Sequence, residues 1–420
     1  MVQITKRKTG LLHSDIIRKQ LCRFIAFLLL SGLILLSYLN RHTSKRLHSF
    51  RLRVPYHKKI TREVGCSVYG CDIYPRELTD DIRKDISEIK GANGNGNGNG
   101  DVLLSYGSKN AGGLTQQGKD HAINQDRGII VAPFYIQNEK VQYFYGSEND
   151  FFIAIYDGHG PIGEQVSEFL QKNLHKRFSD KLSDVDIDKL SPNVIKNLLN
   201  ETFLEMDQEL PSIPGSEYNV GEDGGSTASL ILRLGSLIFF ANAGDSLSFL
   251  AKYDKSSKET TIIHRNRFDK PHLPEERKRI ESMKGKVFIP PHAENSRASA
   301  FYPIRKEVMS LAMSRSIGDN PHTRVGVTAE PIVDVLDIND YAYFQSGERK
   351  DNIELFVVTS SDGLYDHRKP EFVAKRFAKS FYQEDGHAIV ESANIIDLAT
   401  PKDPNRYRDD ITVMSLKVIV

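Results

Sequence analysis

The chain has 420 residues, of which 39% are hydrophobic and 26% are charged. This composition excludes a fully disordered chain and a protein embedded in a membrane along its whole length, and the length accommodates one large or two ordinary domains. The net charge of +1 conceals an asymmetry, because residues 1–63 contain 14 Lys or Arg and only two acidic residues. A basic head and an acidic body are therefore expected to have different roles.

An apolar stretch near the N-terminus predicts a membrane anchor. Phe24–Leu39 is a run of sixteen uncharged, mostly apolar residues with basic residues at both ends, and a bilayer-spanning helix needs about 17–25 residues. The alternatives are a cleaved signal peptide and a buried core helix. The exit "SYLNRH" lacks the small residues of a cleavage site, and the flanking charges disfavour a core helix. We therefore expect a retained single-pass helix.

The segment between this run and the main domain contains three kinds of sequence. Residues 40–63 are basic and suit a stalk lying on anionic headgroups. Pro75–Lys90 has helical periodicity with charged i,i+4 pairs, and the Gly-Asn repeat of Gly91–Gly100 is typical of a flexible linker. The predicted parts are a basic tail at 1–23, an anchor at 24–39, a stalk, helix and linker at 40–100, and a folded domain at 101–420.

Cysteines are too few to form a disulfide framework. The three are Cys22, Cys66 and Cys71, so the last 349 residues contain none. Cys66 and Cys71 are close enough in sequence to pair or to bind a metal, but no further Cys or His completes a zinc set. The alternative is that both are inert thiols.

Short apolar segments separated by turns dominate the chain after residue 101. "VQYFYG" and "FFIAIYD" are expected to pair, "STASLILRL" and "SLIFFANAGD" to form a hairpin turning at residues 234–236, and "LFVVTSSDG" and "ITVMSLKVIV" to be strands. Hairpin spacing favours antiparallel pairing, so the expected fold is α+β: a central antiparallel β-sandwich flanked by helices in α-β-β-α layers. The helical patterns lie at 163–178, 191–210, 273–283 and 369–383.

Aspartates lie at the ends of several predicted strands. Asp157, Asp245 and Asp362 follow strands, whereas Asp126 and Asp409 precede them. Carboxylates that converge on one edge of a sandwich repel one another, and a divalent cation relieves this repulsion. Oxygen-only ligands select Mg²⁺ or Mn²⁺, and four or five carboxylates favour two ions, an arrangement that can drive phosphoryl chemistry. The alternative is that each Asp only caps a turn.

Eight motifs in this order resemble the metal-dependent protein phosphatase 2C family of serine/threonine phosphatases. They extend from about residue 103 to residue 418. The resemblance implies a binuclear Mg²⁺ or Mn²⁺ site, phosphoserine and phosphothreonine proteins as substrates, and a metal-activated water as nucleophile. The motifs are "NQDRG", "YDGHGPIGEQVSEF", "GGSTASLIL", "FANAGDS", "LAMSRSIGD", "GVTAEP", "TSSDGLYD" and "YRDDITV".

The resemblance also implies roles for individual residues. Asp157 would bridge both ions, the carbonyl of Gly158 would bind one of them, and Asp362 and Asp409 would bind the other. His159 would protonate the leaving oxygen. Further implied ligands are Asp126, acting through waters, and Asp245 and Asp319, at positions linked to a looser third metal. The segment Phe288–Val308, which lacks periodicity, is expected to be an irregular flap beside the site that affects substrate choice.

Two departures from the family pattern leave an alternative open. His121 stands where the family has an Arg for the substrate phosphate, so Lys119 and His121 become the candidates for that role. Asp410 follows Asp409 where Asn is usual. These changes favour, as the alternative, a pseudophosphatase that binds phosphoproteins without turnover.

"GLTQQGKD" at Gly113–Asp120 has phosphate-loop spacing but ends in Asp, which cannot replace the Mg²⁺-binding Ser or Thr.

Flanking charge does not orient the predicted anchor. Six basic residues precede Phe24–Leu39 and seven lie within twenty positions after it, so the positive-inside rule gives no direction. Proteins that ordinary kinases phosphorylate on Ser and Thr are cytosolic, and a chain with few cysteines suits a reducing compartment. We therefore expect the catalytic domain on the cytosolic side. The alternative is a mitochondrial membrane, because the first sixty residues are basic and poor in acidic residues. We expect a monomer and no nucleic-acid partner.

Overall fold

The computed structural model describes residues 110–420 with short gaps, and two short strands upstream of them. The gaps are residues 119–121, 133, 135, 139–140, 146–148, 186–188, 213–217, 293–295, 303–306, 345–346, 348 and 402–406. The apolar run Phe24–Leu39, the expected helix Pro75–Lys90 and the Gly-Asn linker lie outside the described residues. Within the part that is described, no helix is long and apolar enough to cross a membrane.

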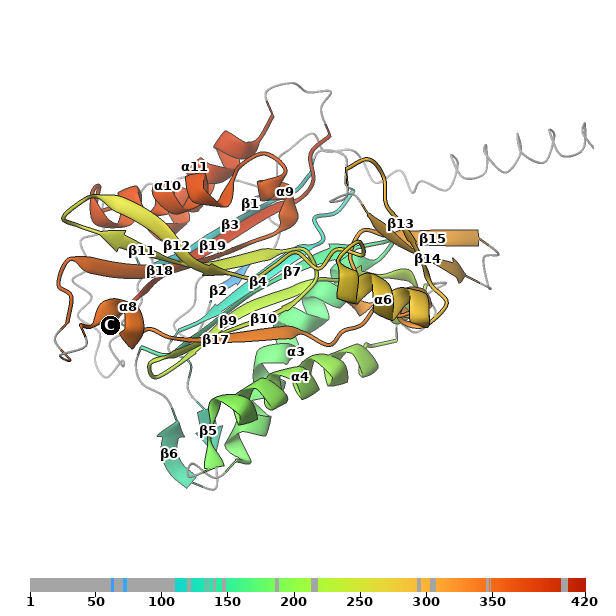
Figure 1. Ribbon diagram of the computed structural model, residues 1–420, viewed down its shortest axis with the longest axis horizontal. Helices are drawn as coiled ribbons and strands as arrows, with labels where there is room; N and C mark the ends of the chain where they lie inside the picture. Colours follow the sequence, from blue (N-terminus) through green and yellow to red (C-terminus); the bar gives the residue numbers. More distant parts are fainter. Residues whose placement is uncertain are drawn as a thin grey trace, which may run out of the picture. The chain divides into compact units, whose positions relative to one another are not determined.

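Two antiparallel sheets form the centre of the fold (Figure 1). The first sheet has six strands, in the order β1 (Arg62–Glu63), β3 (Ala111–Gln116), β19 (Ile411–Val418), β18 (Ile353–Ser360), β11 (Leu247–Asp254) and β12 (Glu259–Arg265). The second follows the order β16 (Ile317–Gly318), β8 (Gly225–Ser226), β7 (Phe151–His159), β9 (Ala228–Leu234), β10 (Leu237–Ala243) and β17 (Ile332–Asp337). It also contains β4 (Asp126–Val131), paired with β7, and β2 (Cys71–Ile73), paired with β4.

Helices cover the outer face of each sheet (Figure 1). The long helices α3 (Gly163–Ser183) and α4 (Pro192–Gln208) pack on the second sheet, and α10 (Pro370–Tyr382) and α11 (Ala388–Ala399) pack on the first. The α-β-β-α order predicted from the sequence is therefore confirmed. The shorter helices are α5 (Val220–Asp223), α6 (Pro274–Ser282), α7 (Asn320–Thr323), α8 (Asn339–Ala342) and α9 (Asp362–Tyr365).

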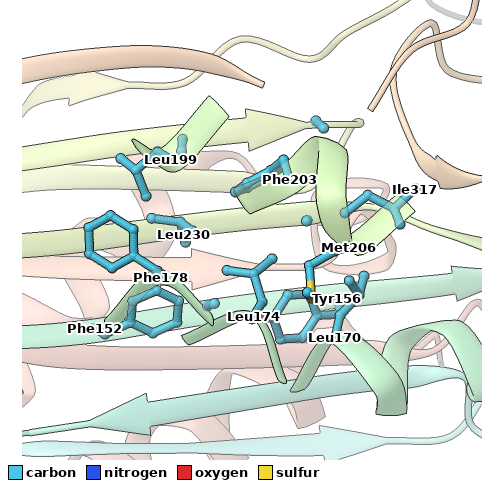
Figure 2. Packing of buried hydrophobic residues seen from close by; sticks show 14 of the residues in the cluster. Phe152, Tyr156, Leu170, Leu174, Phe178, Leu199, Phe203, Met206, Leu230 and Ile317 are labelled. Carbon is cyan, nitrogen blue, oxygen red and sulfur yellow. The ribbon is translucent and has the colours of Figure 1, made fainter. Parts of the chain in front are cut away.

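Strand β7 shows why the sequences of the central strands are continuous apolar runs. Successive side chains of a strand point to opposite faces. Phe152 and Tyr156 belong to the cluster that includes Leu174 and Phe178 of α3 (Figure 2), whereas Ile153 packs with residues of the first sheet. Both faces of the strand are buried, so no alternation of polar and apolar residues appears in its sequence.

The structure corrects part of the predicted pairing. The hairpin of β9 and β10 is confirmed, with Leu234 opposite Leu237. The expected pairing of "VQYFYG" with "FFIAIYD" is wrong, because β6 (Val141–Tyr145) pairs with β5 (Ile136–Asn138), and β7 pairs with β4 and β9. The segment expected to be an irregular flap contributes to a three-stranded antiparallel sheet of β13 (Lys286–Phe288), β14 (Arg297–Tyr302) and β15 (Glu307–Leu311).

The folded unit includes residues upstream of the Gly-Asn linker. Strand β1 pairs with β3, with Arg62 opposite Gln116, and β2 pairs with β4, with Ile73 opposite Gly128. The compact unit extends over Lys59–Val420, so it begins before the boundary expected at residue 101. Strands of two or three residues have too few side chains to show a period, and for this reason the sequence pattern did not reveal them.

Candidate active site

Four of the predicted aspartates meet at one edge of the sandwich. Asp126 begins β4 and Asp157 lies near the end of β7, and the two residues are directly opposite in register. Asp362 lies just after β18 and Asp409 just before β19, and these two strands are antiparallel neighbours. The end of one antiparallel strand lies beside the start of the next, so the four residues lie at the same edge.

A cleft of about 800 Å³ is present at this edge. His159, Lys270 and Arg297 line it together with six carboxylates. The excess of acidic over basic side chains is typical of a site that binds cations. The six carboxylates belong to Asp157, Glu164, Asp245, Asp362, Asp366 and Asp409.

Burial and mutual repulsion raise the pKa values of the carboxyl groups at this edge. Burial raises the pKa of Asp126 to about 7, and the charge of Asp410 adds to the effect. Burial, followed by the charge of Asp126, raises the pKa of Asp157 well above its usual value. The pKa of Asp362 is also raised by burial and then by the charge of Asp245. The described side chains therefore do not fully stabilise the charged forms of these carboxyl groups.

The donor atoms fit a hard divalent cation. The Oδ1 atoms of Asp126 and Asp245 are buried and have no hydrogen-bond partner, and carboxylate and carbonyl oxygens are the ligands that Mg²⁺ and Mn²⁺ prefer. Among the described side chains, no three His, Cys, Asp or Glu converge closely enough to form a metal site by themselves.

The backbone at Gly158 requires a glycine. A Cβ atom there would lie 2.6 Å from the carbonyl oxygen of Gln125 and 2.7 Å from that of Gly163. The Gly158 N–H donates to the same Gln125 carbonyl at 3.2 Å. The close approach of these segments fixes the peptide directly after Asp157, so the Gly158 carbonyl implied as a ligand lies in a tightly held backbone.

His159 pairs with Asp319. The Nε2 atom of His159 lies 2.6 Å from Oδ2 of Asp319, and the two side chains are 22% and 11% exposed. Burial by itself lowers the pKa of His159, but the charge and hydrogen bond of Asp319 outweigh it, so the pKa is raised. The Asp319 carboxylate therefore holds the imidazole of His159, and its expected role at a third metal stays a prediction.

The contact between His159 and Asp319 also requires a glycine at position 225. A Cβ atom on Gly225 would lie 2.1 Å from Oδ2 of Asp319 and 2.5 Å from Nε2 of His159. Asp319 itself has a left-handed backbone, with φ 51° and ψ 40°, which a short polar residue tolerates better than most. The contact between His159 and Asp319 thus depends on two local backbone features as well as on charge.

A second ion pair brings a lysine into the cleft. Lys270 Nζ donates to Oδ2 of Asp245 at 2.6 Å. Burial lowers the pKa of Lys270, but the charge of Asp245 reverses the effect, so the pKa is raised. Lys270 reaches the cleft because the preceding Asp269 is tied to the loop after β10, its N–H donating to the Gly244 carbonyl at 3.0 Å. No spacing in the sequence marks Lys270 as a site residue.

The segment that carries Lys270 is anchored by a buried carboxylate. Glu276 of α6 is fully buried, and it accepts hydrogen bonds from three arginines at 2.6–2.9 Å. Burial raises the pKa of Glu276, but the arginines outweigh burial and hold the pKa at about 2. The three arginines are Arg267, Arg279 and Arg315.

Other site residues were missed or lie outside the described part. Lys119 and His121, the candidates for the substrate phosphate, are not among the described residues. Asp366 lines the cleft, and its position four residues after Asp362, about one helical turn, is a signal that could have revealed it. Asp410 accepts the N–H of Gly118 at 2.5 Å and that of Gln125 at 2.8 Å, so it holds the loop before β4.

Comparison with known proteins identifies the family. The protein phosphatase 2C family model matches residues 131–399. A mouse integrin-linked kinase-associated serine/threonine phosphatase 2C is 27% identical over 276 residues, covering 64% of this chain and 62% of that protein. The bovine protein of the same name is 26% identical over 325 residues, covering 75% of this chain and 77% of that protein. This chain therefore belongs to the protein phosphatase 2C family.

A solved structure has the same fold. A serine-threonine phosphatase 2C from Toxoplasma gondii aligns with a TM-score of 0.56 at 18% sequence identity. The alignment covers 74% of this chain and 94% of that structure. At this identity the likeness concerns the fold alone, and it agrees with the antiparallel sheets and flanking helices described above.

Proposed function

We propose that this protein hydrolyses phosphoserine and phosphothreonine monoesters of proteins, with two Mg²⁺ or Mn²⁺ ions in the cleft. The observation that carries the proposal is the cleft edge where burial and repulsion raise the pKa values of Asp126, Asp157 and Asp362. Divalent cations would compensate this charge. Membership of the protein phosphatase 2C family supports the choice of phosphorylated Ser and Thr.

Four groups would hold the ions: the carboxylates of Asp157, Asp362 and Asp409 and the carbonyl of Gly158. The buried free oxygens of Asp126 and Asp245 would complete the negative surroundings. When bound, such ions supply Lewis acidity, which neutralises phosphoryl oxygens and lowers the pKa of water.

The side chains around the cleft then have separate tasks. Asp319 holds His159 in its protonated form, so the imidazolium can give a proton to the departing Ser or Thr oxygen. Arg297 is exposed and lines the cleft, where its guanidinium can bind phosphate oxygens. Lys270 is bound to Asp245 and acts by placing that carboxylate.

Hydrolysis of p-nitrophenyl phosphate tests this proposal. We expect turnover that requires Mn²⁺ or Mg²⁺, stops with EDTA and is abolished by Asp157→Asn. Asp340→Asn, at an exposed position in α8, is the matched control and should keep the wild-type rate. Turnover unaffected by EDTA would refute the metal mechanism, whereas phosphopeptide binding without any turnover would favour the pseudophosphatase.

We also propose that the protein is anchored in a membrane by Phe24–Leu39, with the catalytic domain in the cytosol. The support is the sequence of this run, which is uncharged, flanked by basic residues and without a cleavage site. Protease added to sealed microsomes tests the orientation. Digestion of the domain agrees with the cytosolic side, and protection contradicts it.

A further inference from the structure

Two large apolar side chains line the acidic cleft and remain exposed. Ile123 is 51% exposed and Tyr407 is 54% exposed, and both belong to the cleft lining. Single exposed apolar residues are common on protein surfaces. Two in one functional cleft are more informative, because apolar surface at a binding site is available to a ligand.

The segments that carry these residues are bonded to each other. Ile123 lies in the loop between β3 and β4, and Tyr407 lies just before β19. The two carboxylate oxygens of Asp410 accept the N–H groups of Gly118, at 2.5 Å, and of Gln125, at 2.8 Å. Both ends of the loop are therefore tied to the segment that carries Tyr407, so the two apolar side chains belong to one held unit.

The hydroxyl of Tyr407 locates this unit relative to the chemistry. It donates to Oδ2 of Asp409 at 3.2 Å, so the ring begins beside a carboxylate proposed to hold an ion. Successive residues of an extended peptide are about 3.3–3.6 Å apart. A ring beside this carboxylate would therefore face the residue next to the phosphorylated one, rather than a residue several positions away. A tyrosine ring has few rotatable bonds and loses little entropy when it makes a contact.

We infer that Ile123 and Tyr407 form an apolar wall that selects substrates with an apolar residue directly beside the phosphoserine or phosphothreonine. This inference rests on the proposed function, because it names the substrate class of the same cleft. The wall acts on the specificity of the reaction. The charged groups of the cleft would contact the phosphate, which every substrate shares, so they would not discriminate between flanking residues.

A different apolar surface is the rival for substrate selection. Phe288 of β13 is 64% exposed and Val308 of β15 is 71% exposed. Phe288 lies directly opposite Arg297 across the β13–β14 pair, so this face adjoins the cleft. Neither apolar residue is part of the cleft lining, and a substrate would reach them only with residues farther from the phosphate.

Two pairs of phosphopeptides test the wall. Each pair is identical except for Leu or Ser at one position, directly before the phosphoserine in one pair and directly after it in the other. For wild-type enzyme with Mn²⁺ we expect kcat/KM to be about tenfold higher for Leu in at least one pair, the lower end of what one apolar side chain contributes in a pocket. Tyr407→Ala and Ile123→Ser should each lower this ratio severalfold, whereas Tyr407→Phe should keep it.

The ratio of two substrates isolates selectivity from catalysis. A variant that disturbs Asp409 or the fold lowers both rates in a pair equally and leaves the ratio unchanged. Phe344→Ala, which removes an aromatic ring 53% exposed and outside the cleft lining, is the matched control and should keep the wild-type ratio.

The outcomes distinguish the inference from the function on which it rests. A wild-type ratio near one in both pairs, with active hydrolysis of p-nitrophenyl phosphate, overturns the wall and leaves the phosphatase proposal standing. If Phe288→Ala abolishes the preference for the Leu peptide and Tyr407→Ala does not, substrate selection belongs to the β13–β15 sheet, and this result also overturns the wall. Absence of hydrolysis of every substrate with Mn²⁺ refutes the proposed function, and the inference with it.

Discussion

Asp319→Asn should remove proton donation by His159 and leave the rest of the cleft intact. The substitution keeps the size of the side chain 2.6 Å from His159 Nε2 but removes its charge. Burial lowers the pKa of His159, and the charge of Asp319 is the main opposing influence. The variant lacks this opposing charge, so the pKa of His159 falls and the imidazole loses its proton at a lower pH than in the wild type.

The size of the effect should depend on the leaving group. A positioned general acid contributes about 10²–10⁴-fold, and the alkoxide of serine needs this proton. We expect kcat on a phosphoserine peptide to fall about 100-fold, at the lower limit of that range. With p-nitrophenyl phosphate, whose leaving phenolate is stable without a proton, kcat should change little. The wild-type activity on the peptide should decline as pH rises through the raised pKa of His159, and the decline should move to lower pH in the variant.

Steady-state kinetics on both substrates, at saturating Mn²⁺ and over a pH series, is the assay. Asp334→Asn is the matched control, because Asp334 Oδ2 lies 3.3 Å from Nε2 of His264 in a second Asp–His pair that does not line the cleft. The control should behave as wild type on both substrates. An equal fall on both substrates in Asp319→Asn, reversed when Mn²⁺ is raised above the concentration that saturates the wild type, would refute our reasoning and support the metal-binding role expected from the sequence.

Three further predictions concern stability. Phe203→Ala, in the fully buried cluster between α4 and the second sheet, should lower the free energy of unfolding in urea by about 3–5 kcal/mol. Phe372→Ala, at an exposed position, should change it little. Equal losses of unfolding free energy in the two variants would contradict the packing described. Glu276→Ala should cost about 3–5 kcal/mol at pH 7, because it removes the buried carboxylate that three arginines share. The stabilisation by Glu276 is fully present above the ordinary glutamate pKa of 4.5 and is lost as pH falls towards the folded pKa of about 2. The difference in unfolding free energy between wild type and variant should therefore narrow below pH 4.5. A fragment of residues 59–420 should unfold at higher urea than one of residues 101–420, because the shorter fragment lacks β1 and β2; identical midpoints would place the boundary at 101 after all.

Much of the fold was predictable because its strands and long helices carry strong local signals. The apolar run of β7, the hairpin of β9 and β10 and the amphipathic stretch of α3 each show their type in ten to twenty residues. Pairing was less predictable. The partner of β7 was expected to be the neighbouring segment in sequence, whereas β7 pairs with β4 and β9, because pairing depends on which faces the whole sandwich can bury.

The candidate site also contains residues that the sequence predicted and residues whose role only the fold revealed. Asp126, Asp157, Asp362 and Asp409 were recognisable because each lies where a strand begins or ends, a position that the chain itself marks. Asp319 was assigned to a metal from its motif alone, and only the folded structure places it against His159.

By itself, the sequence determined the long central strands, the acidic residues at their ends and the family to which the chain belongs, because these properties depend on neighbours along the chain. Only the tertiary structure decided that Lys270 pairs with Asp245, that Asp410 holds the loop before β4, and that Ile123 and Tyr407 line one cleft. The members of these groups come from segments 25 to about 290 residues apart. Their contacts exist only after two sheets have packed together, since packing is what brings distant loops to the same edge.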